Sequence, residues 1–278
     1  MRTNYITSLI IIILFFPVAC KGGAMNEDVH HYKNIGEVPE SVWMTLSEKK
    51  IYFGHQSVGF NIIKGMKDIM AEYPDIKLNI VETHDSKDFS SGVFAHSRVG
   101  QNLDTKIKIN DFTKVLDDGV GRKADAAMLK FCYLDMTKNT DVAKVFGEYH
   151  SAVDQVRQNY PDLTIIHVTE PLTVSETNWK TWIKKVIGKK DFWEFDDNIQ
   201  RNRYNRLLKK EYEGRDPIFD LARIESTNQD GTRKSFTLHG VTYYSMVPEY
   251  TRDGGHLNEI GRKVVAEQLL LFLANRTQ

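Results

Sequence analysis

Two segments that lie far apart in this sequence could together perform nucleophilic catalysis. Ser57 lies in a glycine-flanked turn after a short apolar run, and Asp253 stands three residues before His256, just ahead of an amphipathic stretch. A serine hydroxyl is a poor nucleophile until a base within hydrogen-bond reach accepts its proton, and a carboxylate can orient the imidazole of that base. The residue types and their spacing therefore indicate the nucleophile, base and orienting acid of a Ser-His-Asp hydrolase.

The elements that must position these residues can be predicted from the apolar periodicity. We expect a buried strand at 49–53 before the serine turn and a helix at 58–73 after it. His256 should precede a helix at 258–275, which Asn258 can cap. Both functional segments would then lie where a strand or loop leads into a helix.

The remaining chain predicts a sheet whose strands are separated by helices. Further strands are expected at 76–81, 124–134, 163–169 and 218–224, with a helix at 141–160. Buried strands separated by helices indicate a mainly parallel sheet covered on both faces, and therefore an α/β fold with three layers. Because ligands bind beyond the carboxyl ends of such strands, Ser57 and His256 could meet at one edge of the sheet.

Two sequence blocks resemble the SGNH/GDSL hydrolase family. Residues 253–258, with Gly261 and a helix behind them, are similar to the final block of that family. Ser57, followed by Gly59 and a helix, is similar to the first block. The resemblance spans about 49–275 and implies a flavodoxin-like α/β/α fold. It also implies a carboxylic ester hydrolase. Because no cluster of Cys, His and Asp has the spacing of a zinc site, we expect no metal, and we expect no cofactor.

The resemblance assigns a role to each of the three residues and implies an oxyanion hole. Ser57 would be the nucleophile, His256 the base and Asp253 the carboxylate that orients the imidazole. The amides of Ser57 and Gly100 would donate to the oxyanion. Losing one such donor typically costs about 3–4 kcal/mol of transition-state stabilisation.

The family's third oxyanion donor is an Asn that should follow the strand ending near Cys132, but Leu134 or Asp135 stands there. Asn102 is the substitute we expect, with Asn139 as an alternative, and Gly92 is an alternative to the Gly100 amide. Two explanations stay open. The chain belongs to a divergent subgroup with a rebuilt oxyanion hole, or it has lost hydrolysis.

The turn before the serine also differs from the family pattern. Family members usually carry Gly-Asp directly before the serine, whereas here Gln56 replaces the Asp and the glycine is one residue farther away. His55 is expected to shape the turn, because adjacent residues at a strand end point apart.

The N-terminus predicts an exported lipoprotein. Residues 1–19 have the short apolar run of a signal peptide, and the small residues before Cys20 resemble a lipoprotein processing site. Lipid on Cys20 would hold the chain at a membrane of the bacterial cell envelope, outside the cytoplasm, with 20–40 as a polar tether. Ordinary secretion with an unmodified Cys20 is the alternative.

The predicted hydrolase domain covers 41–278 and contains two irregular regions. Residues 84–122 are weakly patterned, as in a long functional loop. An insertion at about 172–216 carries Trp179, Trp182 and Trp193 and a basic helix. It could be a lid or aromatic platform for a sugar or acyl chain, or an insertion with its own small core and a solvated basic face; we favour the latter.

The composition restricts the partners. Lys and Arg together number 37, as do Asp and Glu, so the charge gives no reason to expect nucleic acid. The substrate class that we expect is an acylated small molecule, glycan or lipid. The alternatives to an ester hydrolase are an O-acyltransferase acting on glycans and a non-catalytic envelope protein that binds glycan.

Overall fold

A six-stranded sheet lies at the centre of the computed structural model, which describes residues 31–175 and 195–277. The strands follow the order β2-β3-β1-β4-β5-β6, and every neighbouring pair is parallel. Their bounds are β1 Lys50–His55, β2 Ile80–Glu82, β3 Val93–Arg98, β4 Ala126–Leu129, β5 Thr164–Val168 and β6 Ile218–Phe219. A separate antiparallel hairpin joins β7 (Ser235–Leu238) to β8 (Val241–Tyr244). The chain thus builds one side of the sheet from β1 through β2 and β3, and the other side from β4 onwards.

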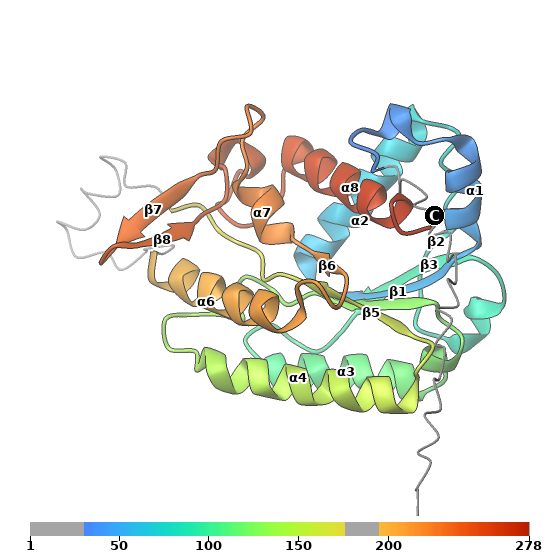
Figure 1. Ribbon diagram of the computed structural model, residues 1–278, viewed down its shortest axis with the longest axis horizontal. Coiled ribbons are helices and arrows are strands. Elements are labelled where there is room, and N and C mark those ends of the chain that lie inside the picture. Colours follow the sequence, from blue (N-terminus) through green and yellow to red (C-terminus); the bar gives the residue numbers. More distant parts are fainter. Residues whose placement is uncertain (1–30, 176–194, 278) are drawn as a thin grey trace, which may run out of the picture. The chain divides into compact units, whose positions relative to one another are not determined.

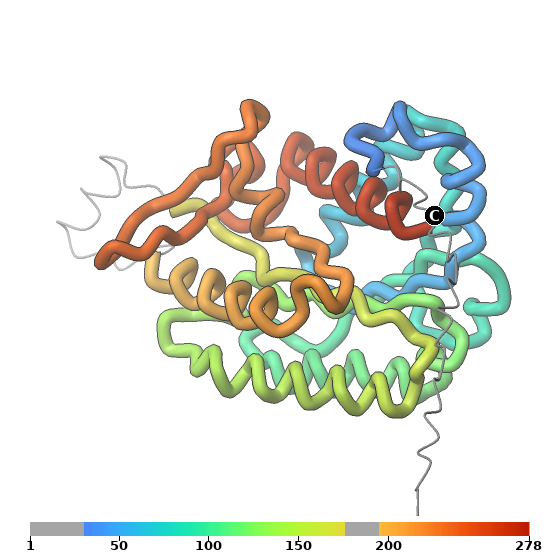
Figure 2. The backbone as a smooth tube through the Cα atoms, in the orientation of Figure 1, coloured from blue at the N-terminus to red at the C-terminus, as the bar shows by residue number. Residues whose placement is uncertain are grey.

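Helices cover both faces of this sheet (Figures 1 and 2). One layer contains α1 (Glu40–Glu48), α2 (Ser57–Glu72), α7 (Leu221–Ser226) and α8 (Glu259–Ala274), and the other contains α3 (Thr105–Asp117), α4 (Val142–Asn159) and α6 (Phe195–Tyr212). Short 3₁₀ helices lie at η1 Ile35–Glu37, η2 Ser86–Ser90, η3 Val120–Arg122 and η4 Pro248–Tyr250. The three layers confirm the predicted α/β fold class.

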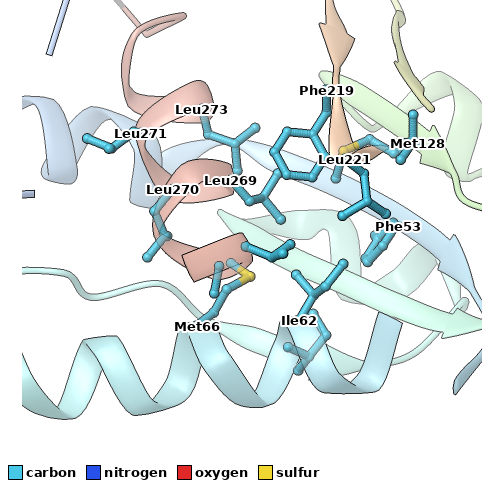
Figure 3. Close-up of a cluster of buried hydrophobic side chains, with 14 of the residues drawn as sticks. Phe53, Ile62, Met66, Met128, Phe219, Leu221, Leu269, Leu270, Leu271 and Leu273 are labelled. Atoms are coloured by element: carbon cyan, nitrogen blue, oxygen red, sulfur yellow. The ribbon is translucent and has the colours of Figure 1, made fainter. Parts of the chain in front are cut away.

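Each helix layer packs on its own hydrophobic core. In β1, Ile51 and Phe53 belong to the core under α2 and α8, whereas Tyr52 between them belongs to the core under α3 and α4. Figure 3 shows Phe53 in the first core, with Ile62 of α2 and Leu269 of α8 drawn in the same cluster. Because successive side chains of a strand point to opposite faces, β1 is apolar on both and lies in the middle of the sheet.

The weakly patterned stretch at 84–122 is not a long loop, since it contains β3 and α3. The apolar pattern did not predict β3 because two of its buried residues, His96 and Ser97, are polar. His96 lies 3.0 Å from His55 through ring nitrogens, and Ser97 lies 2.8 Å from the hydroxyl of Tyr52. Buried polar side chains need such partners, and these partners become visible only when the strands pair.

The predicted last strand at 218–224 is also shorter than expected. It ends at Phe219, because the side chain of Asp220 accepts a hydrogen bond from the Arg223 amide and starts α7 instead.

The predicted tether at 20–40 reaches too far. Tyr32, Ile35 and Val38 are buried in the core under α2 and α8. The backbone of Tyr32 also exchanges two hydrogen bonds with the side chain of Asn275 near the C-terminus. The folded domain therefore includes residues before 41. In the described ranges, no helix has the length and apolar character that crossing a membrane would need.

The described part of the 172–216 insertion does not form a core of its own. Tyr204, Leu208 and Tyr212 of α6 are fully buried in the core shared with α3 and α4. Arg201 is only 1% exposed, so the expected solvated basic face does not include it. Trp179, Trp182 and Trp193 lie outside the described residues.

Candidate active site

Ser57 lies at the first turn of α2, at the carboxyl end of the central strand β1. Gln56 takes an extended conformation between the two elements. Gly59 packs on the imidazole of His55 so closely that a Cβ there would lie 2.1 Å from the ring. Within the described residues, the N–H groups of Ser57 and Val58 have no hydrogen-bond acceptor, as is usual at a helix start. These amides and the positive end of the helix dipole can stabilise an anion beside the serine.

The fold brings Ser57, His256 and Asp253 into one hydrogen-bonded chain. The Ser57 Oγ lies 3.0 Å from the His256 Nε2, and the His256 Nδ1 lies 2.7 Å from the Asp253 Oδ2. Since an ionised carboxylate can only accept, Nδ1 donates to Asp253 and the Nε2 lone pair faces the serine hydroxyl. In this arrangement the imidazole can accept the serine proton.

The turn before α8 holds the Asp253 carboxylate in place. Its Oδ1 accepts hydrogen bonds from the amides of Gly255 and His256 at 3.0 and 2.8 Å. Burial by itself would raise the pKa of Asp253, but these two amides and the imidazole together lower it to about 2. Asp253 is therefore ionised over the whole neutral range. Asn258 caps α8 as predicted, accepting from the amides of Ile260 and Gly261.

Tyr133, from the loop after β4, contacts the imidazole and was missed in the sequence. Its ring meets the His256 ring edge to face at 5.5 Å, and its hydroxyl lies 3.4 Å from the His256 Nδ1. Burial is the largest cause that raises the pKa of Tyr133 to about 12, so the hydroxyl keeps its proton. Arg201 of α6 donates from Nε to the Tyr133 carbonyl at 2.8 Å. The only signal for Tyr133 in the sequence was that it stands next to the position where the family carries its oxyanion Asn.

Asp135, in the block where an Asn donor was expected, is a buried acceptor. Its carboxylate forms a buried ion pair with Lys108 of α3. It also accepts from the amides of Leu103 at 2.9 Å and Cys132 at 2.7 Å. Asp135 thus ties the loop after β3 to the loop after β4, and it cannot donate to an oxyanion.

The two glycines considered as oxyanion donors lie in different environments. The Gly100 amide donates to the Asp111 carboxylate at 2.8 Å, so its proton is already bound. The backbone of Gly100 has φ +55° and packs against Lys108. Gly92 precedes β3, at the opposite end of the sheet from Ser57. This geometry favours neither glycine as the second donor.

The two asparagines considered as donors are both exposed. The Oδ1 of Asn102 accepts from the Lys108 Nζ at 3.1 Å, which leaves its amide protons available. Asn139 lies in the loop after β4 and has no hydrogen-bond partner in the described part of the chain. Neither side chain bonds to the triad in those residues, so the donor role of Asn102 stays a prediction.

Metal ligation and the cavity between α7 and α8 were considered as further candidate sites in the described ranges. No group of three or more His, Cys, Asp or Glu side chains there could hold a metal ion. A cavity of about 770 Å³ opens between α7 and α8 and is lined by residues such as Phe219, Arg223 and Phe272. None of Ser57, Asp253 and His256 lines it.

Three solved structures with low sequence identity align with most of this chain. A candidate platelet activating factor from Streptococcus pneumonia superposes with a TM-score of 0.50 at 16% identity, over 84% of this chain and 92% of that one. A candidate SGNH hydrolase from Slackia heliotrinireducens gives 0.45 at 12% identity, over 80% and 97%. The periplasmic domain of a lipopolysaccharide acetyltransferase from Salmonella ser. Paratyphi A gives 0.43 at 12% identity, over 80% and 83%.

Two sequence comparisons gave different results. The comparison with curated protein sequences found no match. The family profile described as GDSL-like Lipase/Acylhydrolase matches residues 53–269, a range that runs from within β1 through the serine turn and the other strands of the sheet to α8. This chain therefore belongs to the GDSL-like lipase/acylhydrolase family.

Proposed function

We propose that this protein is a serine ester hydrolase that works through an acyl-enzyme. The observation that carries the proposal is the hydrogen-bonded chain from Ser57 through His256 to Asp253. Membership of the family supports hydrolysis as the class of reaction.

In the proposed mechanism each step has its own residue, and the distances within the triad support these roles. The Ser57 Oγ attacks the ester carbonyl carbon while the His256 Nε2 takes the serine proton. The N–H groups of Ser57 and Val58 stabilise the negative oxygen of the tetrahedral intermediate. His256 then gives the proton to the departing alcohol, which leaves an acyl group on Ser57. Water attacks this acyl group by the same route, and the carboxylic acid leaves.

The substrate and the location belong to the same proposal. The N-terminal sequence favours a lipid anchor on Cys20, which would hold the domain outside the cytoplasm at the cell envelope. An enzyme placed there would meet acylated glycans, acylated small molecules and lipids. We favour removal of acyl groups from an envelope or extracellular glycan or lipid.

A fluorophosphonate probe tests the proposal directly. Wild-type protein should hydrolyse a small aryl ester and become labelled at Ser57, whereas Ser57→Ala should do neither and should keep its melting temperature nearly unchanged. Hydrolysis that persists in Ser57→Ala would move the chemistry to another residue. Absence of both activity and labelling in the wild type would favour a non-catalytic glycan-binding protein.

The acyl acceptor is a separate question, because the same triad can transfer the acyl group to a sugar hydroxyl. The His256 side chain is 40% exposed, which leaves room for an acceptor larger than water to approach. Turnover of an acyl donor should be measured with and without an oligosaccharide. Release of free acid alone supports the hydrolase, and acylated oligosaccharide as the main product would support the O-acyltransferase.

A further inference from the structure

Three loops meet around Ser57 because their strands are neighbours in the sheet. The order β3-β1-β4 places the loops after these strands at the same edge. Gln56 alone links β1 to α2, which begins at Ser57, and the loop after β4 carries Tyr133. Residues 99–104 follow β3 and lead into α3, and we call them the β3–α3 loop. The position of that loop relative to the serine decides whether its backbone can contribute to catalysis.

Gln56 joins the serine turn to the β3–α3 loop with both protons of its side-chain amide. Its Nε2 donates to the carbonyl of Val99 at 2.7 Å and to the carbonyl of Gly100 at 2.8 Å. Gln56 is only 6% exposed, so neither bond is exchanged freely with water. A primary amide has two N–H donors, and this contact uses both of them.

The β3–α3 loop contains a backbone conformation that is energetically unfavourable for a residue with a Cβ, so contacts from outside the loop are needed to maintain it. Gly100 and Leu103 both have positive φ, +55° and +70°, and the Leu103 side chain is exposed. A positive φ is uncommon for a residue with a Cβ and persists only where surrounding contacts enforce it. Within the described residues, the amides of Gln101 and Asn102 have no hydrogen-bond acceptor. The loop thus carries two exposed backbone donors that no acceptor in the described part of the chain occupies.

We infer that Gln56 is a positioning residue, which holds the β3–α3 loop against the serine turn and so places the loop's donors relative to the Ser57 Oγ. This inference rests on the proposed hydrolase function. The Asp that the family usually carries before its serine could not make these contacts, since a carboxylate only accepts and would face two carbonyl oxygens. Gln at position 56, in place of the usual Asp, therefore provides the two donors that bind the carbonyls of Val99 and Gly100.

The test compares Gln56→Glu and Gln56→Ala with the wild type on a small aryl ester. Gln56→Ala should lower kcat by about 10- to 100-fold with little change in KM, because a displaced loop harms the transition state more than binding. Gln56→Glu should lower kcat further at neutral pH, since its carboxylate repels both carbonyls. As pH falls, its kcat relative to wild type should rise, because a protonated carboxyl regains one donor.

The pH readout separates positioning from a purely structural role. The charged and ionisable groups of the surrounding elements are His55 on β1, His96 and Arg98 on β3, Lys108 and Asp111 on α3, Lys130 and Asp135 after β4, and Asp253 and His256 before α8. These groups are common to variant and wild type, so the ratio of the two kcat values removes the part of their contribution that the substitution leaves unchanged. A matched control is Gln155→Glu, the same change on an exposed position of α4. Its ratio to wild type should stay constant at every pH.

Outcomes that overturn the inference are distinct from those that overturn the proposed function. If the wild type labels at Ser57 and both Gln56 variants keep its kcat, Gln56 does not position the loop. A change in KM alone, or a pH-independent ratio for Gln56→Glu, would also overturn it. If Gln56→Glu fails to fold, the split between kcat and KM in Gln56→Ala decides. Failure of the wild type to hydrolyse or label would instead remove the proposed function itself.

Discussion

The His256 Nε2 lies 3.0 Å from the Ser57 Oγ, although 199 residues separate the two in the chain. Each residue is placed by a different end of the fold. Ser57 follows the central strand and begins α2, whereas His256 ends the turn before α8. Helices α2 and α8 pack on each other in the same layer of the sandwich. The contact between nucleophile and base therefore depends on the packing of these two helices.

Asp253→Asn should lower kcat by about a thousandfold to ten-thousandfold with little change in KM. An amide can present its N–H to the imidazole, which would favour the wrong tautomer and remove the lone pair that faces Ser57. Steady-state kinetics on an aryl ester measure the effect. Asp75→Asn, the same change at an exposed site beyond the opposite end of α2 from Ser57, should behave as wild type. A raised KM at constant kcat would contradict the orienting role of Asp253.

Acid should remove the contribution of Asp253 to stability within a narrow pH window. The folded-state pKa of about 2 lies below the ordinary value of 3.8. A depressed pKa stabilises the fold above the ordinary value, and this stabilisation is lost as pH falls towards the folded-state pKa. The wild-type advantage over Asp253→Asn in free energy of unfolding should therefore shrink between about pH 4 and pH 2. The side chain is 57% exposed, so the effect should be small, and an advantage that grows on acidification would contradict it.

Gly255→Ala should impair catalysis through Tyr133. A Cβ at Gly255 would lie 2.7 Å from the Tyr133 ring, so either the ring or the turn that carries His256 must move. We expect kcat to fall tenfold or more, since displacements of about 1 Å can cost a hundredfold. Gly147→Ala is the control, because nothing lies within 4 Å of its Cβ position on α4. That change should keep activity and add about 0.5–1 kcal/mol of stability.

Asn102→Ala tests the predicted side-chain donor of the oxyanion hole. If the Asn102 amide donates to the oxyanion, kcat should fall by about a hundredfold with the fold intact. The structure allows this, because Lys108 occupies only the Oδ1 of that side chain. Kinetics and a melting curve suffice as measurements. An unchanged kcat would leave Asn139 or a hole made of backbone amides.

Cys20→Ser tests the predicted lipid anchor. The wild type should take up labelled fatty acid and fractionate with membranes, and the variant should do neither or should remain as an uncleaved precursor. A wild type that takes up no label and stays in the soluble fraction would rule out the anchor. The esterase activity of the isolated domain should not depend on this residue, because the described core begins after it.

The sequence by itself was enough to predict those features that depend only on residues close together in the chain. The helices expected at 58–73 and 258–275 are present as α2 and α8, each within about a residue of its predicted start and end, because apolar periodicity and capping are local signals. The Asp-x-x-His spacing is equally local. The Oδ1 of Asp253 accepts from the amide three residues on, which shapes the turn that holds His256.

Only the tertiary structure decided which groups meet between loops. Gln56 reaches the carbonyls of the β3–α3 loop, and the Gly100 amide is taken by Asp111 of α3. Tyr133 meets His256 across 123 residues. None of these contacts has a fixed spacing in the chain, since each follows from the order in which strands and helices pack. The physical reason is that hydrogen bonds between loops depend on positions in space, whereas the local sequence determines only the turn or helix to which each residue belongs.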